Sequence, residues 1–278
     1  MRQEHANKQQ YRFMQTLRLT LSNPALWLLA ISLGMLNACR YGFIDWGVSH
    51  LVTIESTEKI HLQINNILAA DEITPANRNR YQQLLTLDLS TKEGGESYRA
   101  AITDGLLPKT KKGGLLTLKA AVKYTILPLG AILGAFLSGW ATDRFFGSRR
   151  APVICFLLIM LGCLTLIYDQ TARTSFGWTM VLLAMIGFTI YGPQVLLVGT
   201  APADLARDGT AAAAAGFVNC VGYFGAAFAG DKLTGYIADT YGWQVAIYGW
   251  AGWAFGAAIT VAFLWTATGF DKKTKAVT

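Results

Sequence analysis

Long apolar runs alternate with short polar segments along most of the chain. Each must be helical if it lies in lipid, because lipid offers no partners for backbone N–H and C=O groups. Six runs have about the 20-residue length that an α-helix needs to cross a bilayer: 24–51, 120–142, 152–168, 177–200, 210–238 and 243–268. The third is short, and Asp231 and Lys232 interrupt the fifth, so five spans is the alternative count. The pattern predicts an all-α membrane protein with six transmembrane helices.

Composition supports this prediction. Apolar residues make up 53% of the 278 residues and charged residues 15%, whereas a soluble domain carries about 25% charged residues. Residues 1–22 are polar and lack the apolar centre of a cleavable signal peptide. The chain is therefore expected to be a multi-pass membrane protein.

Basic residues in the short loops predict the orientation, because Lys and Arg concentrate on the cytoplasmic side. With a cytoplasmic N-terminus, the short outside loops carry only Arg173. The inside segments then carry eleven basic residues: Arg2, Lys8, Arg12, Arg18, Arg144, Arg149, Arg150, Arg207, Lys272, Lys273 and Lys275. We therefore expect both termini in the cytoplasm. The net charge of +7 reflects this topology rather than binding to nucleic acid.

The expected domains are a cytoplasmic basic segment (1–22), a first transmembrane helix (23–54), a periplasmic insertion (55–118), five further transmembrane helices (119–270) and a cytoplasmic tail (271–278). Eight basic and eight acidic residues cancel within the insertion. Helical spacing of Ile60, Ile64, Ile67 and Leu68 predicts one helix there, and Thr74-Pro75 is a good start for a second. Gly94-Gly95 and Gly113-Gly114 predict loops. The insertion has no catalytic motif, and we interpret it as a cap on the outer surface.

Small residues and prolines within the spans suggest how the helices pack. The fifth span is rich in Gly and Ala over 211–216 and 222–230, which lets backbones approach closely. Pro128 and Pro193 can kink their helices. All four cysteines lie in apolar runs, without metal-ligand or disulfide spacing, and are expected to be packing residues: Cys39, Cys155, Cys163 and Cys220.

Arg40 is the polar residue within a span that most needs an explanation. A charge at the bilayer centre costs about 2.5–3.5 kcal/mol even on the lenient insertion scale. Asp45 follows five residues later, about 140° around the helix, so the two do not face each other as i,i+4 partners would. Asp231 could neutralise Arg40 from the fifth span. Two hypotheses remain open: a structural ion pair, and an anion-binding site that faces a water-filled cavity.

Tyr191 and Tyr223 favour the second hypothesis, because both fall midway along their spans, at the depth of Arg40. A guanidinium offers a planar, permanently charged fork to phosphate, and a phenol donates a hydrogen bond without adding charge. Each tyrosine alone is more often a packed aromatic residue than a ligand. The sequence shows no nucleotide-binding loop, no metal cluster and no Ser-His-Asp set, and His5, His50 and His61 lie at or beyond the predicted edges of the membrane. We therefore expect neither an enzyme nor a metal or cofactor.

Several motifs resemble the C-terminal half of the organophosphate:inorganic phosphate antiporters, a family of the major facilitator superfamily. Asn23-Pro24-Ala25-Leu26-Trp27 and Arg40-Tyr41-Gly42-Phe43-Ile44-Asp45-Trp46 resemble the family's seventh helix. Gly139 to Arg150 resembles the loop between helices eight and nine, with Asp143, Arg144, Arg149 and Arg150 as its motif. Gly187-Phe188 and Tyr191-Gly192-Pro193-Gln194 are similar to helix ten. Gly216-Phe217, Gly222-Tyr223 and 235–243 are similar to helix eleven and its exit.

The resemblance implies a secondary transporter of the glycerol-3-phosphate or hexose-6-phosphate type, located in a bacterial inner membrane. Such a protein exchanges a phosphate ester for inorganic phosphate while two helix bundles alternate around a central site. Arg40 would be one of two arginines that hold the phosphate, and Tyr191 and Tyr223 would line the same cavity. The same family contains a receptor-like sensor, so sensing of phosphate esters is the alternative, as is a non-functional fragment.

Three positions depart from the family pattern. Asn37 stands where a tyrosine often precedes the arginine by one turn, which alters the binding site and makes Asn37 a further candidate for substrate binding. Pro128 replaces a glutamate that could pair during gating. Asp231 replaces a lysine found in some hexose-phosphate transporters, and with Asp45 and Lys232 it becomes a candidate for gating or charge pairing.

The family has twelve helices, and this chain matches the last six. Residues 1–22 resemble the end of the family's central cytoplasmic loop. The resemblance therefore implies a partner besides substrate, phosphate and lipid: a six-helix N-terminal half, supplied by the same gene product or by a separate chain.

Overall fold

A computed structural model describes residues 13–69, 73–88, 91–108, 114–147, 149–207 and 209–265. Within these ranges the regular structure is helical throughout, with no strand. The helices are α1 (Phe13–Leu21), α2 (Pro24–Tyr41), η1 (Gly42–Trp46), α3 (Gly47–Leu68), α4 (Pro75–Thr86), α5 (Lys92–Thr103), α6 (Gly114–Tyr124), α7 (Ile126–Phe145), α8 (Arg150–Thr174), α9 (Phe176–Val195), η2 (Leu196–Thr200), α10 (Ala201–Leu205), α11 (Ala211–Gly225), η3 (Ala226–Lys232), α12 (Leu233–Tyr241) and α13 (Trp243–Ala262). The three η elements are π-helical turns.

The predicted six spans are confirmed. Six continuous helical segments are long and apolar enough to cross a membrane: Pro24–Leu68, Leu118–Phe145, Arg150–Thr174, Phe176–Leu205, Ala211–Tyr241 and Trp243–Ala262. The first is longer than expected. The predicted ends at 51 and 54 fall inside α3, which continues as an unbroken helix to Leu68.

Local chemistry sets several of these ends. The Asn23 side chain accepts a hydrogen bond from the Ala25 N–H and donates one to the Leu205 carbonyl, so it caps α2 and ties it to α10. Pro24 occupies the first turn of α2, where its missing N–H costs little. Gly242 adopts φ 87° between α12 and α13, a conformation that favours glycine.

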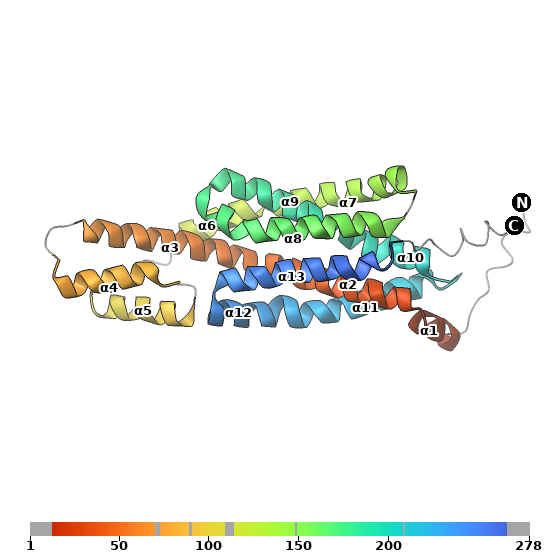
Figure 1. Cartoon of the computed structure of the whole chain (residues 1–278), viewed down its shortest axis with the longest axis horizontal. Coiled ribbons are helices and arrows are strands. Elements are labelled where there is room, and N and C mark those ends of the chain that lie inside the picture. The colour runs from red at the N-terminus through yellow and green to blue at the C-terminus, as the bar shows by residue number, and fades with distance from the viewer. Residues whose placement is uncertain are drawn as a thin grey trace, which may run out of the picture.

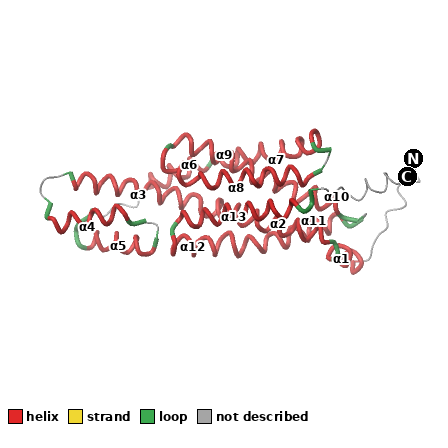
Figure 2. Tube along the Cα trace, viewed as in Figure 1, coloured by secondary structure: helices red, strands yellow, loops and turns green. Residues whose placement is uncertain are grey.

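The transmembrane helices run side by side as one bundle (Figures 1 and 2). Helix α2 packs against α11 and α13, α13 packs against α8, α8 against α9, and α9 against α7. At the end opposite α1, the segment α3 to α5 projects beyond the bundle (Figure 1). The bundle therefore has two distinct ends. The α7–α8 turn and α10 form one end, and the α8–α9 and α12–α13 turns form the other.

Glycine allows the closest helix contact, between α7 and α9. A Cβ atom on Gly130 would overlap the Ala184 carbonyl, one on Gly134 the Phe188 carbonyl, and one on Gly187 the Leu127 carbonyl. At the α2–α11 contact, a Cβ on Gly225 would lie 2.9 Å from the Gly34 Cα. Small residues in the fifth span therefore do pack against a neighbour, as predicted, but the tightest seam lies elsewhere.

The insertion has a small core of its own. Helices α3, α4 and α5 bury a separate apolar cluster that consists of Ile60, Ile64, Tyr81, Leu84, Ala101 and Leu107. The prediction of a loop at Gly94-Gly95 was wrong: both lie in the first turn of α5, where the Thr91 side chain accepts a hydrogen bond from the Gly94 N–H. This cap compensates for the low helix propensity of glycine. Gly113 lies outside the described residues, and Gly114 begins α6.

The cysteine positions correct one prediction, and His50 has a role that the sequence did not indicate. Cys39 and Cys155 are buried, but Cys163 and Cys220 are exposed on the bundle and are not packing residues within it. His50, predicted to lie near the edge of the membrane, is fully buried within the protein. Its Nε2 lies 2.9 Å from Asp169 Oδ1, and its Nδ1 lies 3.3 Å from the Tyr168 hydroxyl. This network joins α3 to α8.

The α7–α9 seam predicts unequal effects of two Gly→Ala substitutions. Gly187→Ala should lower the free energy of unfolding by about 1–3 kcal/mol, because the added methyl group meets backbone that can only move with its helix. Gly139→Ala in the facing helix meets open space and should be neutral or slightly stabilising. Thermal unfolding in detergent measures both, and equal effects would contradict the packing described here.

Candidate binding site around a buried arginine

Arg40 lies in the last turn of α2, at the junction with η1. It is 7% exposed, although its helix lies within a membrane-spanning segment. Buried charges are normally paired, and the structural hypothesis expected a carboxylate partner. Within the described ranges, no carboxylate forms an ion pair with Arg40. Its Nε and Nη2 atoms are buried without a hydrogen-bond partner.

Three tyrosine rings surround the guanidinium. The Arg40 Cζ lies 4.6 Å from the ring centroid of Tyr41 and 5.8 Å from those of Tyr191 and Tyr223. Tyr41 and Tyr223 also meet edge to face, with centroids 6.3 Å apart. The structure thus brings together the three residues that the sequence placed at one depth. Tyr41 was missed, because adjacent residues in a helix point about 100° apart.

A π-helical turn follows each of these residues. η1 begins two residues after Arg40, η2 five residues after Tyr191, and η3 three residues after Tyr223. A π-turn adds a residue to one helical turn and frequently marks a functional site. Gly42 makes room in η1 for the Trp250 indole, and the Tyr124 hydroxyl donates a hydrogen bond to the Phe43 carbonyl. No periodicity of the sequence predicted these turns.

Amide side chains lie one helical turn from the site on all three helices. Asn37 is fully buried, and its Nδ2 donates a hydrogen bond to the Gly222 carbonyl at 3.2 Å. Gln194 follows Tyr191 by three residues, and Asn219 precedes Tyr223 by four. Each of the three amides has a buried carbonyl oxygen without a partner. Asn37 therefore joins α2 to α11 beside the site, with no exposed surface in this conformation.

The predicted gating residues lie apart from these contacts. Asp45, Asp231 and Lys232 are exposed, and none of them forms an ion pair with another described residue. Asp45 interacts electrostatically with both Asp231 and Arg40 without touching either. Asp45 thus lies within electrostatic range of the guanidinium but leaves it unpaired.

The α7–α8 turn contains the charged motif expected from the sequence. Arg150 donates to Asp143 from Nη1 at 2.9 Å and to Asp204 from Nε at 3.1 Å. It therefore joins α7, α8 and α10 at one end of the bundle. Arg144 and Arg149 are exposed. Asp204 was missed, since it is distant in sequence and belongs to none of the motifs that were recognised.

The described residues contain no group of three or more His, Cys, Asp or Glu side chains that could hold a metal ion. What the arrangement around Arg40 offers is a positive charge with two free donor positions, flanked by phenols. Such a fork suits a carboxylate or phosphate oxygen pair.

Comparison with known proteins identifies the class. The model of the Major Facilitator Superfamily matches residues 117–277, more than half of the chain. The chain therefore belongs to the Major Facilitator Superfamily.

Individual relatives narrow this class to the organophosphate:inorganic phosphate antiporters and confirm the resemblance drawn from the motifs. A probable hexose phosphate transport protein of Chlamydia pneumoniae is 30% identical over 57% of this chain and 34% of its own length. The glycerol-3-phosphate transporter of Bacillus subtilis is 34% identical over 44% of this chain and 27% of its own length. The membrane sensor protein UhpC of Escherichia coli is 34% identical over 52% of this chain and 33% of its own length. The chain thus spans about a third of these relatives.

The unpaired state of Arg40 predicts that removing its charge stabilises the isolated chain. Desolvating an ion costs several kcal/mol, and a cation–π contact returns about 0.5–2 kcal/mol at best, with two of the three rings near the limit of the interaction. Arg40→Met should therefore raise the free energy of unfolding in detergent. Arg150→Met should lower it, because that substitution leaves Asp143 and Asp204 without their shared partner. Destabilisation by Arg40→Met would show that Arg40 has a structural role.

Proposed function

We propose that this chain is the C-terminal half of a secondary transporter for phosphorylated metabolites, such as glycerol-3-phosphate or a sugar phosphate, in exchange for inorganic phosphate. The observation that carries the proposal is the buried Arg40 guanidinium, whose Nε and Nη2 have no partner. A stable fold gains nothing from such a group, whereas a phosphate that binds in alternation with water uses both donors.

Phosphate would bind between Arg40 and the hydroxyl groups of Tyr191 and Tyr223, which donate without adding charge. Tyr41 would shield the guanidinium on its other side and keep it in place. A single guanidinium does not balance a dianionic phosphate. We therefore propose that a six-helix N-terminal half, in the same product or a second chain, supplies the second arginine opposite Arg40.

The amide side chains one helical turn from Arg40, Tyr191 and Tyr223 would select the organic part of the substrate. Gln194 and Asn219 lie one turn from the tyrosines, and each has an unpartnered carbonyl oxygen that can accept a hydrogen bond from a substrate hydroxyl. Asn37, already bonded to Gly222, would set the spacing between α2 and α11 rather than contact substrate in this conformation. This differs from the direct role expected from the sequence.

Alternating access would use the ion pairs at one end of the bundle and the π-turns near its middle. The Arg150–Asp143–Asp204 cluster joins three helices at the end predicted to be cytoplasmic. The π-turns after Arg40, Tyr191 and Tyr223 are places where a helix can change its winding without breaking. We place the α4–α5 insertion in the periplasm and both termini in the cytoplasm, as the distribution of basic residues predicts.

Sensing of a phosphate ester is the second candidate, favoured by the 34% identity to a membrane sensor protein. A sensor needs the same Arg40 site but not the exchange of substrate for phosphate. Binding with flux therefore indicates a transporter, and binding without flux indicates a sensor.

Arg40→Lys provides the test of the site. Co-expressed with a matching N-terminal half in membrane vesicles, the chain should exchange ³²P-phosphate, and Arg40→Lys should remove most of this exchange. An ammonium keeps the charge but cannot form the two parallel hydrogen bonds of a guanidinium.

The matched control is Arg80→Lys, in the exposed ion pair with Asp104 on the insertion, which should leave exchange unchanged. Immunoblotting of the membranes checks that both variants insert equally. Full exchange by Arg40→Lys would remove Arg40 from the binding site.

A further inference from the structure

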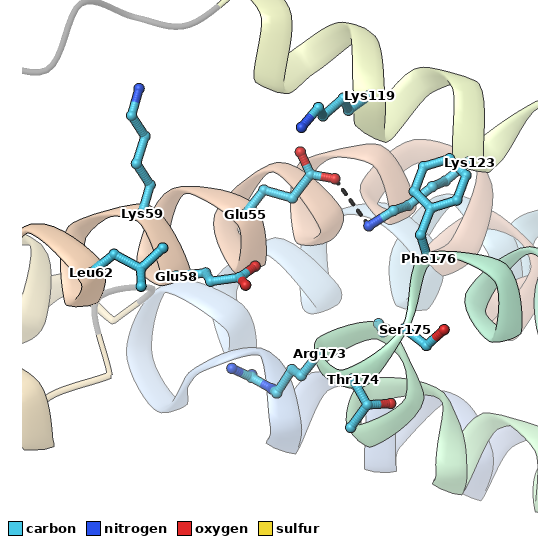
Figure 3. A pocket seen from close by; sticks show the side chains of 11 residues that line it. Glu55, Glu58, Lys59, Leu62, Lys119, Lys123, Arg173, Thr174, Ser175 and Phe176 are labelled. Atoms are coloured by element: carbon cyan, nitrogen blue, oxygen red, sulfur yellow. Dashed lines mark ion pairs between the residues drawn. The ribbon is translucent and has the colours of Figure 1, made fainter.

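A charged cavity that does not include Arg40 lies at the end of the bundle where α3 projects. It has a volume of about 470 Å³, within the range of small-molecule sites. Helix α3 contributes Glu55, Glu58 and Lys59, helix α6 contributes Lys119 and Lys123, and the α8–α9 turn closes the remaining side (Figure 3). Neither the motifs nor the central site accounts for this cavity.

One wall of the cavity is a nearly buried ion pair. Lys123 Nζ lies 3.0 Å from Glu55 Oε1, with side-chain exposures of 8% and 10%. Lys123 also lies 5.2 Å above the Phe176 ring. The second carboxylate oxygen, Glu55 Oε2, is buried and has no hydrogen-bond partner. A carboxylate oxygen can only accept hydrogen bonds, so the cavity holds an unused acceptor.

The cavity also contains unused cations. Within the described residues, Lys59 and Lys119 form no ion pair, whereas Arg173 is already paired with Asp169. Figure 3 shows Lys119 directed toward the Glu55 carboxylate, with no bond between them, while Glu58 and Arg173 face the cavity from opposite sides. Glu58 forms no ion pair with another described residue either.

We propose that this cavity binds a phosphate ester that carries hydroxyl or ammonium donors. The phosphate lies between Lys119 and Lys59, two ammonium groups that together match the two negative charges of a monoester. The donors of the ester bond to Glu55 Oε2 and Glu58. Inorganic phosphate satisfies the cations but has only its own P–OH group to offer the two carboxylates, so the cavity prefers the ester. A free sugar phosphate is a monoester with hydroxyl donors, and a phosphatidylethanolamine headgroup is a diester with one negative charge and an ammonium donor.

Binding measured on the whole chain tests this proposal independently of the central site. The chain is reconstituted in phosphatidylcholine nanodiscs with Arg40→Gln, which removes the guanidinium of the central site. Equilibrium dialysis with radiolabelled glucose-6-phosphate should then show one saturable site per chain. Lys119→Gln should weaken it at least tenfold, and Lys92→Gln, a matched exposed lysine on α5, should have no effect.

A second pair of variants tests the carboxylates. Glu58→Gln should reduce the preference for glucose-6-phosphate over inorganic phosphate, and the exposed Glu96→Gln should not. Glu58 and Glu96 are both exposed, so these substitutions do not disturb the buried Glu55–Lys123 ion pair.

Binding of a lipid headgroup is tested by native mass spectrometry of the chain purified with phosphatidylethanolamine. Retention of that lipid, lost in Lys119→Gln but not in Lys92→Gln, assigns the cavity to a headgroup. Absence of both saturable sugar-phosphate binding and lipid retention would overturn the proposal. Binding with the same affinity in the Lys119→Gln variant would overturn it as well. Neither result bears on exchange through Arg40.

Discussion

Much of this molecule is arranged around one unfavourable group, a guanidinium buried in a membrane-spanning helix without a counter-ion. Arg40 is 7% exposed, and its Nε and Nη2 bond to nothing. Lipid and a packed helix bundle both penalise this arrangement. The tyrosines at 41, 191 and 223 soften the penalty by cation–π contact but do not neutralise the charge. The chain thus stabilises Arg40 without consuming its donors, as a reversible anion site requires.

The rest of the bundle keeps that group in position. Asn37 fixes α2 to α11 one turn away, and Gly42 lets Trp250 pack against the turn that follows. Glycines at the α7–α9 contact let the two backbones approach closely, so these helices are packed tightly against each other. The π-turns lie next to the site residues, where a change of winding would move them most.

The sequence predicted the six spans, because twenty-residue apolar runs in lipid have no alternative to helix. It also predicted that Arg40, Tyr191 and Tyr223 lie at one depth, since depth follows from counting residues along a span. Their convergence on one point could not be predicted, because that depends on which helices are neighbours and how each is rotated. Tyr41 and Asp204 were missed for the same reason, as was the burial of His50.

Local rules failed where a cap or a tertiary contact outweighed propensity. Gly94-Gly95 reads as a loop, yet the Thr91 cap holds both in the first turn of α5. The first span was predicted to end near residue 54, but burial of Ile60 and Ile64 against α4 and α5 favours one continuous helix. Polar residues that follow an apolar run are compatible with a loop and with a helix that projects from the membrane, so the sequence did not distinguish the two.

The central claim is that Arg40 is unpaired because phosphate is its partner. The most direct measurement is the dipolar coupling between ¹⁵N in labelled arginine side chains and ³¹P in bound glycerol-3-phosphate, by solid-state NMR of the chain with its N-terminal half in lipid. The account predicts a coupling at the Arg40 guanidinium that corresponds to direct hydrogen bonding and disappears in Arg40→Lys. Bound ligand that shows no coupling to Arg40 would contradict it.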